Sequence, residues 1–167
     1  NQTTNPSVTL VWAAVTGVLG VGFLSHFFPS IGRGRLTLRK ASRTSSGADE
    51  LPFYFAGDRT IFVAGHVDGS MAAYFIINPT QAGVKFIPSP GLLMLIAREK
   101  KIGVEKVTGL KIKAGPYETT GDPRDAVKFP PGLDAGHGFL LGGLIGADAF
   151  KGKVVSLDFT RMRLSVE

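Results

Sequence analysis

Apolar residues follow two different patterns along the chain, and the first is a single long run. Between residues 8 and 28, "VTLVWAAVTGVLGVGFLSHFF", only Thr, Ser and His side chains interrupt the apolar ones. A helix of that length rises about 30 Å, which is the thickness of the hydrocarbon core of a bilayer. The pattern therefore predicts a transmembrane helix over residues 8–28.

Two other interpretations of this run are less consistent with its flanks. A signal peptide needs basic residues ahead of a shorter apolar core, whereas residues 1–7 carry no Lys or Arg. A buried helix of a soluble core is normally shorter or carries a polar stripe. Within the predicted membrane helix, Ala13, Gly17 and Gly20 lie largely on one face, where small side chains let a helix of another protein approach closely.

The second pattern, short alternating runs separated by turn residues, covers residues 53–167 and is typical of a mainly β domain. Asp68-Gly69 is a hairpin turn signal between two apolar runs. The residues 92–101, apolar early and charged late, predict one main helix that ends before Gly103, and a short helix is expected at 147–150. Strands are predicted at 61–67, 72–77, 84–87, 110–113, 126–129, 154–159 and 163–166.

The net charge of +6 comes from one short segment rather than from the whole chain. No charged side chain precedes Arg33, and the Lys and Arg residues after residue 43 nearly balance the Asp and Glu residues. A nucleic-acid-binding domain carries its basic patch across the fold, so the distribution argues against a nucleic acid as partner. The segment consists of Arg33, Arg35, Arg39, Lys40 and Arg43, and we call it the basic cluster.

The basic cluster also predicts an orientation, because positive residues close to a membrane helix tend to stay on the cytoplasmic side. The N-terminus is then outside, and the main domain lies on the cytoplasmic side or on the matrix side of an organelle membrane. The positive charge of the cluster would also attract anionic lipid headgroups. The predicted organisation is an N-terminal tail (1–7), a single-pass transmembrane helix (8–28), a basic juxtamembrane segment with a polar linker (29–52) and a β domain (53–167).

The stretch at residues 75–86, "FIINPTQAGVKF", has the layout of an active-site loop without its chemistry. An apolar strand-like run stops at "NPTQ" and then resumes. The interruption contains no acid, no base, no nucleophile and no metal ligand. The segments on either side of "NPTQ" therefore decide what kind of loop it is.

Residues 61–89 and 143–166 ("GLIGADAFKGKVVSLDFTRMRLSV") resemble the opening and terminal segments of retropepsin-like aspartic proteases. Members of that family have two strands that run into an Asp-Thr-Gly loop, then often a helix, flap strands, a Gly-x-Asp turn with a short helix, and a closing hairpin. The resemblance implies a mainly β fold, a closed or partly open retropepsin-like β-barrel with one main helix, here preceded by a single transmembrane helix.

The resemblance also implies that this member is inactive. Asn78 stands where the family has the aspartate that activates water, and Pro79, Thr80 and Gln81 follow it. An amide cannot exchange a proton near neutral pH, so Asn78 cannot act as a general acid or base. Pro79 lacks the hydroxyl that braces the loop in the family, and Thr80 carries a Cβ where glycine permits close backbone approach.

Other candidate chemistry has simpler explanations. Asp68 belongs to a turn, Asp148 matches the structural Gly-x-Asp position implied by the resemblance, and Asp158 lies in the closing hairpin. The histidines His26, His66 and His137 are far apart in sequence and lack partners at ligand spacing, so no metal site is predicted. The glycines of "GHGFLLGG" fit no dinucleotide motif, and no cofactor is expected.

Together these observations favour a non-catalytic accessory or scaffold subunit of a larger membrane protein complex, which binds other subunits through an inactive aspartic-protease-like domain. The alternative is an active membrane-bound aspartic protease with an atypical site, which needs another carboxylate in the cleft. A third class is a lipid or polyanion binder that works through the basic cluster.

Overall fold

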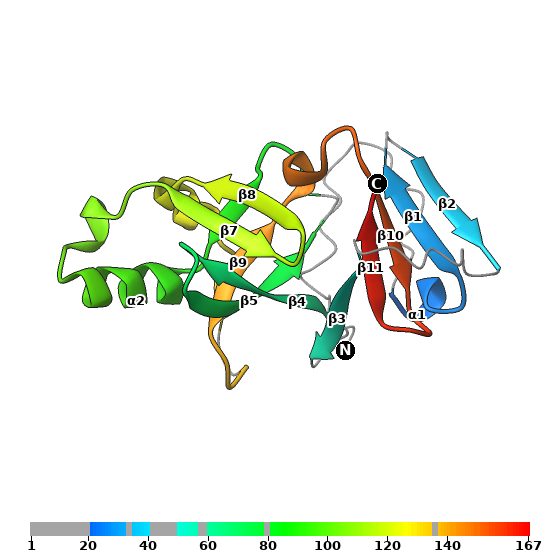
Figure 1. Ribbon diagram of the computed structural model, residues 1–167, viewed down its shortest axis with the longest axis horizontal. Helices are drawn as coiled ribbons and strands as arrows, with labels where there is room; N and C mark the ends of the chain where they lie inside the picture. Colours follow the sequence, from blue (N-terminus) through cyan, green and yellow to red (C-terminus); the bar gives the residue numbers. More distant parts are fainter. Residues whose placement is uncertain (1–20, 33–34, 41–49, 57–59, 79–80, 135–136) are drawn as a thin grey trace.

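The computed structural model describes residues 21–32, 35–40, 50–56, 60–78, 81–134 and 137–167. Their strands form one eleven-stranded mixed sheet with the order β2-β1-β10-β11-β3-β4-β5-β9-β6, and β7 and β8 branch from β4 (Figure 1). The strands β2 and β6 lie at opposite ends of this path, so the sheet is not closed. The expectation of a mainly β domain with one main helix is confirmed.

One end of the sheet, at the right of Figure 1, is an antiparallel set of short strands. It joins residues that are far apart in the chain, because β10 pairs with β1 and β11 pairs with β3. Along β10 and β11 alternate side chains are buried, which is the pattern of strands with one face against a core. The strands are β1 (Phe28–Gly32), β2 (Arg35–Arg39), β3 (Glu50–Ala56), β10 (Val154–Asp158) and β11 (Arg163–Val166).

The other end of the sheet is built around the predicted hairpin. Asp68 and Gly69 both have positive φ, 49° and 83°, which matches the twist of a tight hairpin turn. The strand β9 then inserts between β5 and β6, parallel to the first and antiparallel to the second. The strands are β4 (Thr60–Val67), β5 (Met71–Ile77), β6 (Phe86–Pro88), β7 (Leu110–Ala114), β8 (Tyr117–Gly121) and β9 (Leu141–Ile145).

The main helix, α2 (Pro90–Lys100), has well-defined ends. The hydroxyl of Ser89 accepts a hydrogen bond from the Leu92 N–H, and Pro90 occupies the first helical position, where its missing N–H costs nothing. Lys101 adopts the left-handed conformation at the C-terminus. The prediction of a helix at 92–101 is confirmed with shifted ends, and the short helix at 147–150 is confirmed as η3 (Ala147–Phe150).

The core consists of two apolar clusters on the two sides of this part of the sheet. The larger one contains Phe53, Phe75, Phe86 and the buried side of α2, and the Phe75 and Phe86 rings meet edge to face at 5.8 Å. The smaller one contains Phe62, Ile76, Val84, Ile87, Phe129, Leu141 and Leu144. Both clusters contain residues of β5 and β9, so close packing fixes the position of the end of β5, from which the next segment begins.

The structure differs from the prediction at the N-terminal side. Residues 8–20 of the predicted transmembrane helix, with Ala13, Gly17 and Gly20, lie outside the described residues. The described part, α1 (Val21–Leu24), ends at Leu24, and Phe28 already begins β1. Pro29 disfavours a helical conformation of Phe28, which is consistent with Phe28 belonging to β1. No helix among the described residues is long and apolar enough to cross a membrane.

The segment 29–52 was expected to be a juxtamembrane segment and linker, but it contributes to three strands. It contains most of β1, all of β2 and the start of β3. The strand β1 pairs with β10 and with β2, and β3 pairs with β11. The pattern Arg-Leu-Thr-Leu-Arg at 35–39 alternates polar and apolar side chains, which is a strand pattern. The ordered sheet therefore extends to the N-terminal side of Phe53.

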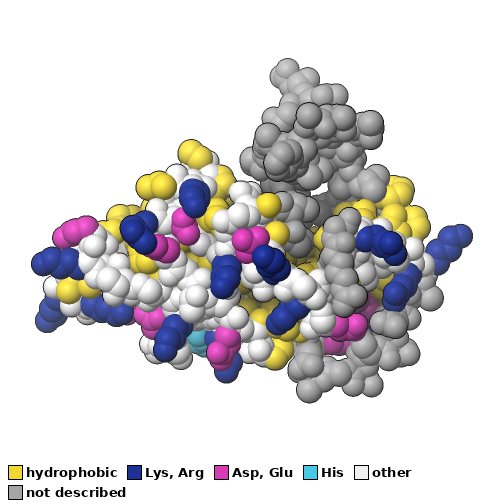
Figure 2. Space-filling view, turned by 90° about the horizontal axis from the view of Figure 1, so that it is seen from above, with side chains coloured by type: hydrophobic (Ala, Val, Ile, Leu, Met, Phe, Trp, Pro, Cys, Tyr) yellow, Lys and Arg dark blue, Asp and Glu magenta, His cyan; other side chains and the backbone are white. Residues whose placement is uncertain are grey.

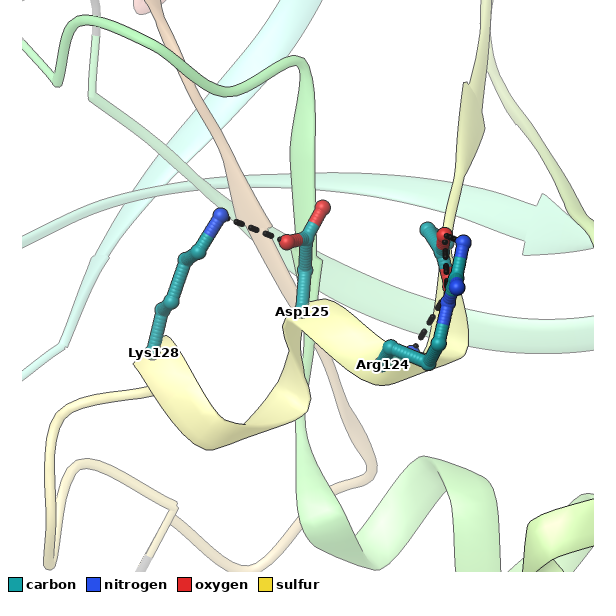
Figure 3. Close-up of polar contacts among 4 residues, drawn as sticks. Arg124, Asp125 and Lys128 are labelled. Carbon is teal, nitrogen blue, oxygen red and sulfur yellow. Dashed lines mark hydrogen bonds and ion pairs between the residues drawn. The ribbon is translucent and has the colours of Figure 1, made fainter.

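The predicted strand at 126–129 is wrong, because this segment belongs to the 3₁₀ helix η2 (Pro123–Lys128). Asp122 caps the helix by accepting a hydrogen bond from the Arg124 N–H at 2.9 Å, and the guanidinium of Arg124 also donates to it (Figure 3). A second ion pair, Lys128 with Asp125, lies along the same helix. A further 3₁₀ helix, η1 (Val104–Lys106), follows α2. The strands β8 and β9 were not predicted.

Candidate functional site

The candidate site is the loop that leaves β5 at Ile77, where the sequence predicts a vestigial catalytic loop. Asn78 is half-buried, and its backbone N–H donates to the carbonyl of Ile145 in β9 at 2.9 Å. The Gln81 N–H donates to the Asn78 carbonyl at 3.2 Å, which closes a tight turn. Pro79 and Thr80 lie outside the described residues, and Gln81 is exposed.

The loop is held against the turn that follows β9. The N–H groups of Gly146, Ala147 and Asp148 donate to the carbonyls of Lys85, Gln81 and Val84 at 2.9, 2.8 and 3.2 Å. A Cβ added at Gly146 would lie 2.5 Å from the Val84 carbonyl oxygen, so only glycine allows this approach. The residues 81–85 and the turn 146–148, more than sixty residues apart in the chain, therefore form one hydrogen-bonded unit.

The three carboxylates considered from the sequence lie in different places. Asp68 accepts hydrogen bonds from the Lys111 N–H at 3.1 Å and from the Lys100 ammonium at 3.2 Å, at the far end of β5 from Asn78. Asp158 accepts from the Arg161 N–H at 2.9 Å and caps the closing turn. Of these three, only Asp148 belongs to a segment that bonds to the loop.

The space beside the loop is small. A cavity of about 30 Å³ lies under the β7–β8 hairpin, next to the residue that precedes Asn78. Pockets that hold small molecules are typically about 300 Å³ or larger. The cavity is lined by Leu51, Ile77, Ile112, Ala114, Tyr117, Glu118, Thr119, Ile145, Ala149, Phe150, Lys153 and Leu164. Apolar side chains from β3, β7, β9 and β11 contribute to this lining.

A hydrogen bond also ties the hairpin to the closing strand. The Val166 N–H donates to the hydroxyl of Tyr117 at 3.1 Å, and the same hydroxyl lies 3.5 Å from the Val166 carbonyl oxygen. The ammonium of Lys153 lies 5.9 Å from the centre of the Tyr117 ring. The β7–β8 hairpin is therefore attached to β11 on the side that borders the small cavity.

The histidines do not come together. His26 follows α1 and is exposed, and His66 is exposed on β4. His137 contacts the Leu133 carbonyl through Nε2 at 2.7 Å, and its ring stacks on Phe139. Within the described residues, no group of three His, Asp or Glu side chains is placed to hold a metal ion.

The described part of the basic cluster lies on β2 and directly after it. Arg35 and Arg39 stand at the two ends of this strand, Lys40 follows, and Arg33 and Arg43 lie outside the described residues. Figure 2 shows basic side chains projecting at the end of the molecule formed by β1 and β2, at the right. A surface hollow of about 420 Å³ lies between the two arginines. It is lined by Ser30, Gly32, Arg35, Thr37, Arg39, Val154, Ser156 and Glu167.

Sequence reasoning missed a row of hydroxyl residues across β2, β1, β10 and β11, of which Thr37, Ser30 and Ser156 line this hollow. The strand registers place Thr37 beside Ser30, Ser30 beside Ser156, and Ser156 beside Ser165. The hydroxyls of Ser30 and Ser156 lie 2.8 Å apart. A signal exists in the sequence, because each of these residues is a Ser or Thr flanked by apolar residues in a short run: "PSI", "LTL", "VSL" and "LSV".

No family model matches this chain, and neither a curated protein nor a solved structure is significantly similar to it.

Proposed function

We propose that this chain is a non-catalytic, retropepsin-like accessory subunit of a membrane protein complex, which binds other protein subunits. The order of elements supports the fold assignment. The hairpin β4–β5, the loop from Asn78, β6, α2, the hairpin β7–β8, β9, the turn at Gly146 with η3, and the hairpin β10–β11 follow one another as the resemblance implies. The sheet is open, which agrees with the partly open form of the expected barrel.

One observation carries the proposal for function. The residue in the position of the catalytic aspartate is Asn78, and its loop is fixed by backbone hydrogen bonds to the turn at Gly146. An amide there neither accepts a proton from water nor returns one to a leaving group. The cavity beside the loop, which Ile77 lines, has a volume of about 30 Å³, and this is far smaller than a typical ligand pocket, which supports the same interpretation.

A domain that has lost catalysis but keeps an ordered sheet can still bind other chains. The strands at the ends of the sheet present backbone groups that pair with an added strand. Attachment to a membrane is proposed from the apolar run at residues 8–28. In this arrangement the β domain lies on the cytoplasmic or matrix side and anionic headgroups are near the basic cluster.

The proposal is tested by extracting the full chain from its native membrane with a mild detergent and identifying the proteins that remain bound after purification. The expected result is a defined set of partner subunits and no cleavage of a peptide library by the purified complex. Recovery of a lone monomer that cleaves peptides, with inhibition by pepstatin, would overturn the proposal.

An active aspartic protease with an atypical site is the second candidate, because the segment of Asp148 bonds to the loop. If the purified chain cleaves peptides, Asp148→Ala is expected to abolish the cleavage by this mechanism. The control is Asp68→Ala, whose carboxylate bonds to Lys100 and the Lys111 backbone at the far end of β5. If both variants cleave peptides as fast as the unsubstituted chain does, neither Asp148 nor Asp68 supplies the catalytic carboxylate.

A further inference from the structure

We infer that the outer edge of β2 binds an acidic, extended segment of a partner protein by strand addition. The segment alternates acidic and apolar side chains, with acidic residues at its first and fifth positions. This inference rests on the proposed function as a protein-binding subunit. It assigns the binding surface and the chemistry of the partner.

The first support is the outer backbone edge of β2, which pairs with no other described strand. Among the described strands, β2 pairs only with β1. The residues Val154 and Glu167 exchange both backbone hydrogen bonds, at 2.7 and 3.0 Å. Along an antiparallel strand, residues whose N–H and C=O groups bond to one neighbouring strand alternate with residues whose groups point to the opposite side. The registers of β10, β1 and β2 carry this alternation from Val154 to β2 and show which backbone N–H and C=O groups of β2 point toward β1. Thr37 bonds to β1, and the N–H and C=O groups of Leu36 and Leu38 point outward.

The second support is the division of β2 into two faces. Arg35, Thr37 and Arg39 lie on the face of the hollow, because alternate side chains of a strand share one face. Leu36, on the opposite face, is 41% exposed. An added strand would therefore meet basic and hydroxyl groups on one face and an apolar side chain on the other. This arrangement is complementary to a segment that alternates acidic and apolar residues.

The third support is the positive charge of Arg35 and Arg39. Within the described residues, neither Arg35 nor Arg39 has an acidic partner in a salt bridge, whereas Arg161 pairs with Glu50 at 2.6 Å. Glu167 also lines the hollow, three strand spacings or about 14 Å from Arg35, and Arg39 lines a neighbouring hollow together with Glu50, Asp158 and Glu167. The positions 35 and 39 are about 13 Å apart along the strand, so two acidic residues four apart on an added strand match them.

Other occupants fit this edge less well. A second copy of β2 paired antiparallel about Thr37 would set Arg35 against the Arg39 of its partner, and like charges directly opposite destabilise a strand pair. A lipid headgroup would satisfy the arginines but would leave the outward backbone groups and Leu36 without a role. An acidic peptide strand uses all three features.

The test uses the full chain in mild detergent and a fluorescein-labelled peptide that contains Asp-Val-Thr-Val-Asp, with binding followed by fluorescence anisotropy. The double variant Arg35→Glu/Arg39→Glu is expected to weaken binding about tenfold, since two attractive contacts become repulsive. The matched control is Lys106→Glu/Lys151→Glu, which changes the net charge equally at exposed positions away from β2 and should bind as the unsubstituted chain does.

A second variant separates strand addition from simple charge attraction. Leu36→Pro removes one outward N–H, and proline is tolerated on an edge strand when its nitrogen faces solvent. Binding of the peptide should fall several-fold while the circular dichroism spectrum stays unchanged. Unchanged binding of the peptide to Leu36→Pro, or displacement of the peptide by phosphatidylserine vesicles, would overturn the inference.

The outcome is separable from that of the proposed function. If the peptide does not bind but the same partner subunits co-purify with Arg35→Glu/Arg39→Glu, the docking edge is wrong and the accessory role stands. If no partner co-purifies with the unsubstituted chain, the accessory role itself fails.

Discussion

Replacing Gly146 by alanine tests whether the loop from Asn78 and the turn after β9 form one rigid unit. The backbone at Gly146, with φ −90° and ψ 177°, is accessible to alanine, so the substitution introduces no dihedral strain. The new methyl group would instead lie 2.5 Å from the Val84 carbonyl oxygen and 3.0 Å from that of Gln81. Both are backbone atoms that cannot rotate away, so the two segments must separate.

The expected cost follows from this clash. Overpacking of a well-packed site costs about 1–3 kcal/mol, and the smaller entropy of the unfolded alanine chain returns about 0.5 kcal/mol. The free energy of unfolding should therefore fall by about 1–2 kcal/mol. With a urea dependence of about 1.5 kcal/mol per molar, the unfolding midpoint should decrease by about 1 M. Urea unfolding of the full chain in mild detergent, followed by far-UV circular dichroism, measures it.

The matched control is Gly91→Ala in the first turn of α2. Its added Cβ would meet only the Ser89 Oγ at 3.9 Å, an ordinary contact, and alanine favours a helix over glycine. This variant should be as stable as the unsubstituted chain or slightly more stable. If Gly146→Ala unfolds at the same urea concentration as Gly91→Ala, the reasoning about the docked loop is refuted.

Two further predictions concern capping groups. Ser89→Ala removes a buried hydroxyl that accepts a hydrogen bond from the Leu92 N–H, which caps α2, and donates one to the Leu141 carbonyl. The free energy of unfolding should therefore fall by about 1–3 kcal/mol in the same urea experiment. An unchanged unfolding midpoint would contradict this prediction. The hydrogen bonds that Arg124 donates lower the pKa of the Asp122 carboxyl from its ordinary value of 3.8 to about 2. Because the folded pKa is depressed, this cap contributes fully above about pH 4 and is lost as the pH falls through about 2. An NMR titration of the Asp122 carboxyl checks this, and a midpoint near 3.8 would contradict it.

The elements that were predicted well are those whose signals are local. The Asp68-Gly69 turn, the main helix α2 and the short helix at 147–150 depend on residues within a few positions of one another. The hairpin β10–β11 is a neighbouring pair of the same kind. Short-range hydrogen bonds and turn conformations decide such elements, so they can be inferred from a few residues.

The missed elements depend on distant partners. The run at 141–145 contains Gly142 and Gly143, which have low strand propensity, yet it forms β9 because β5 and β6 bind it on both sides. A Cβ at Gly143 would lie 2.3 Å from the Ile87 carbonyl oxygen, so glycine is required by a strand that is remote in sequence. In η2, the cap at Asp122 and the proline after it outweighed the apolar alternation of 126–129.

The sequence by itself determined that the domain is mainly β, that Asn78 interrupts an apolar run without a catalytic group, and that the positive charge lies in one segment. Only the tertiary structure decided what surrounds these features. It holds the loop from Asn78 against the turn at Gly146, and it makes Arg35 and Arg39 the two ends of an edge strand. The physical reason is that residue identity sets local conformation and charge, whereas strand pairing across the whole chain sets which backbone groups and side chains become neighbours.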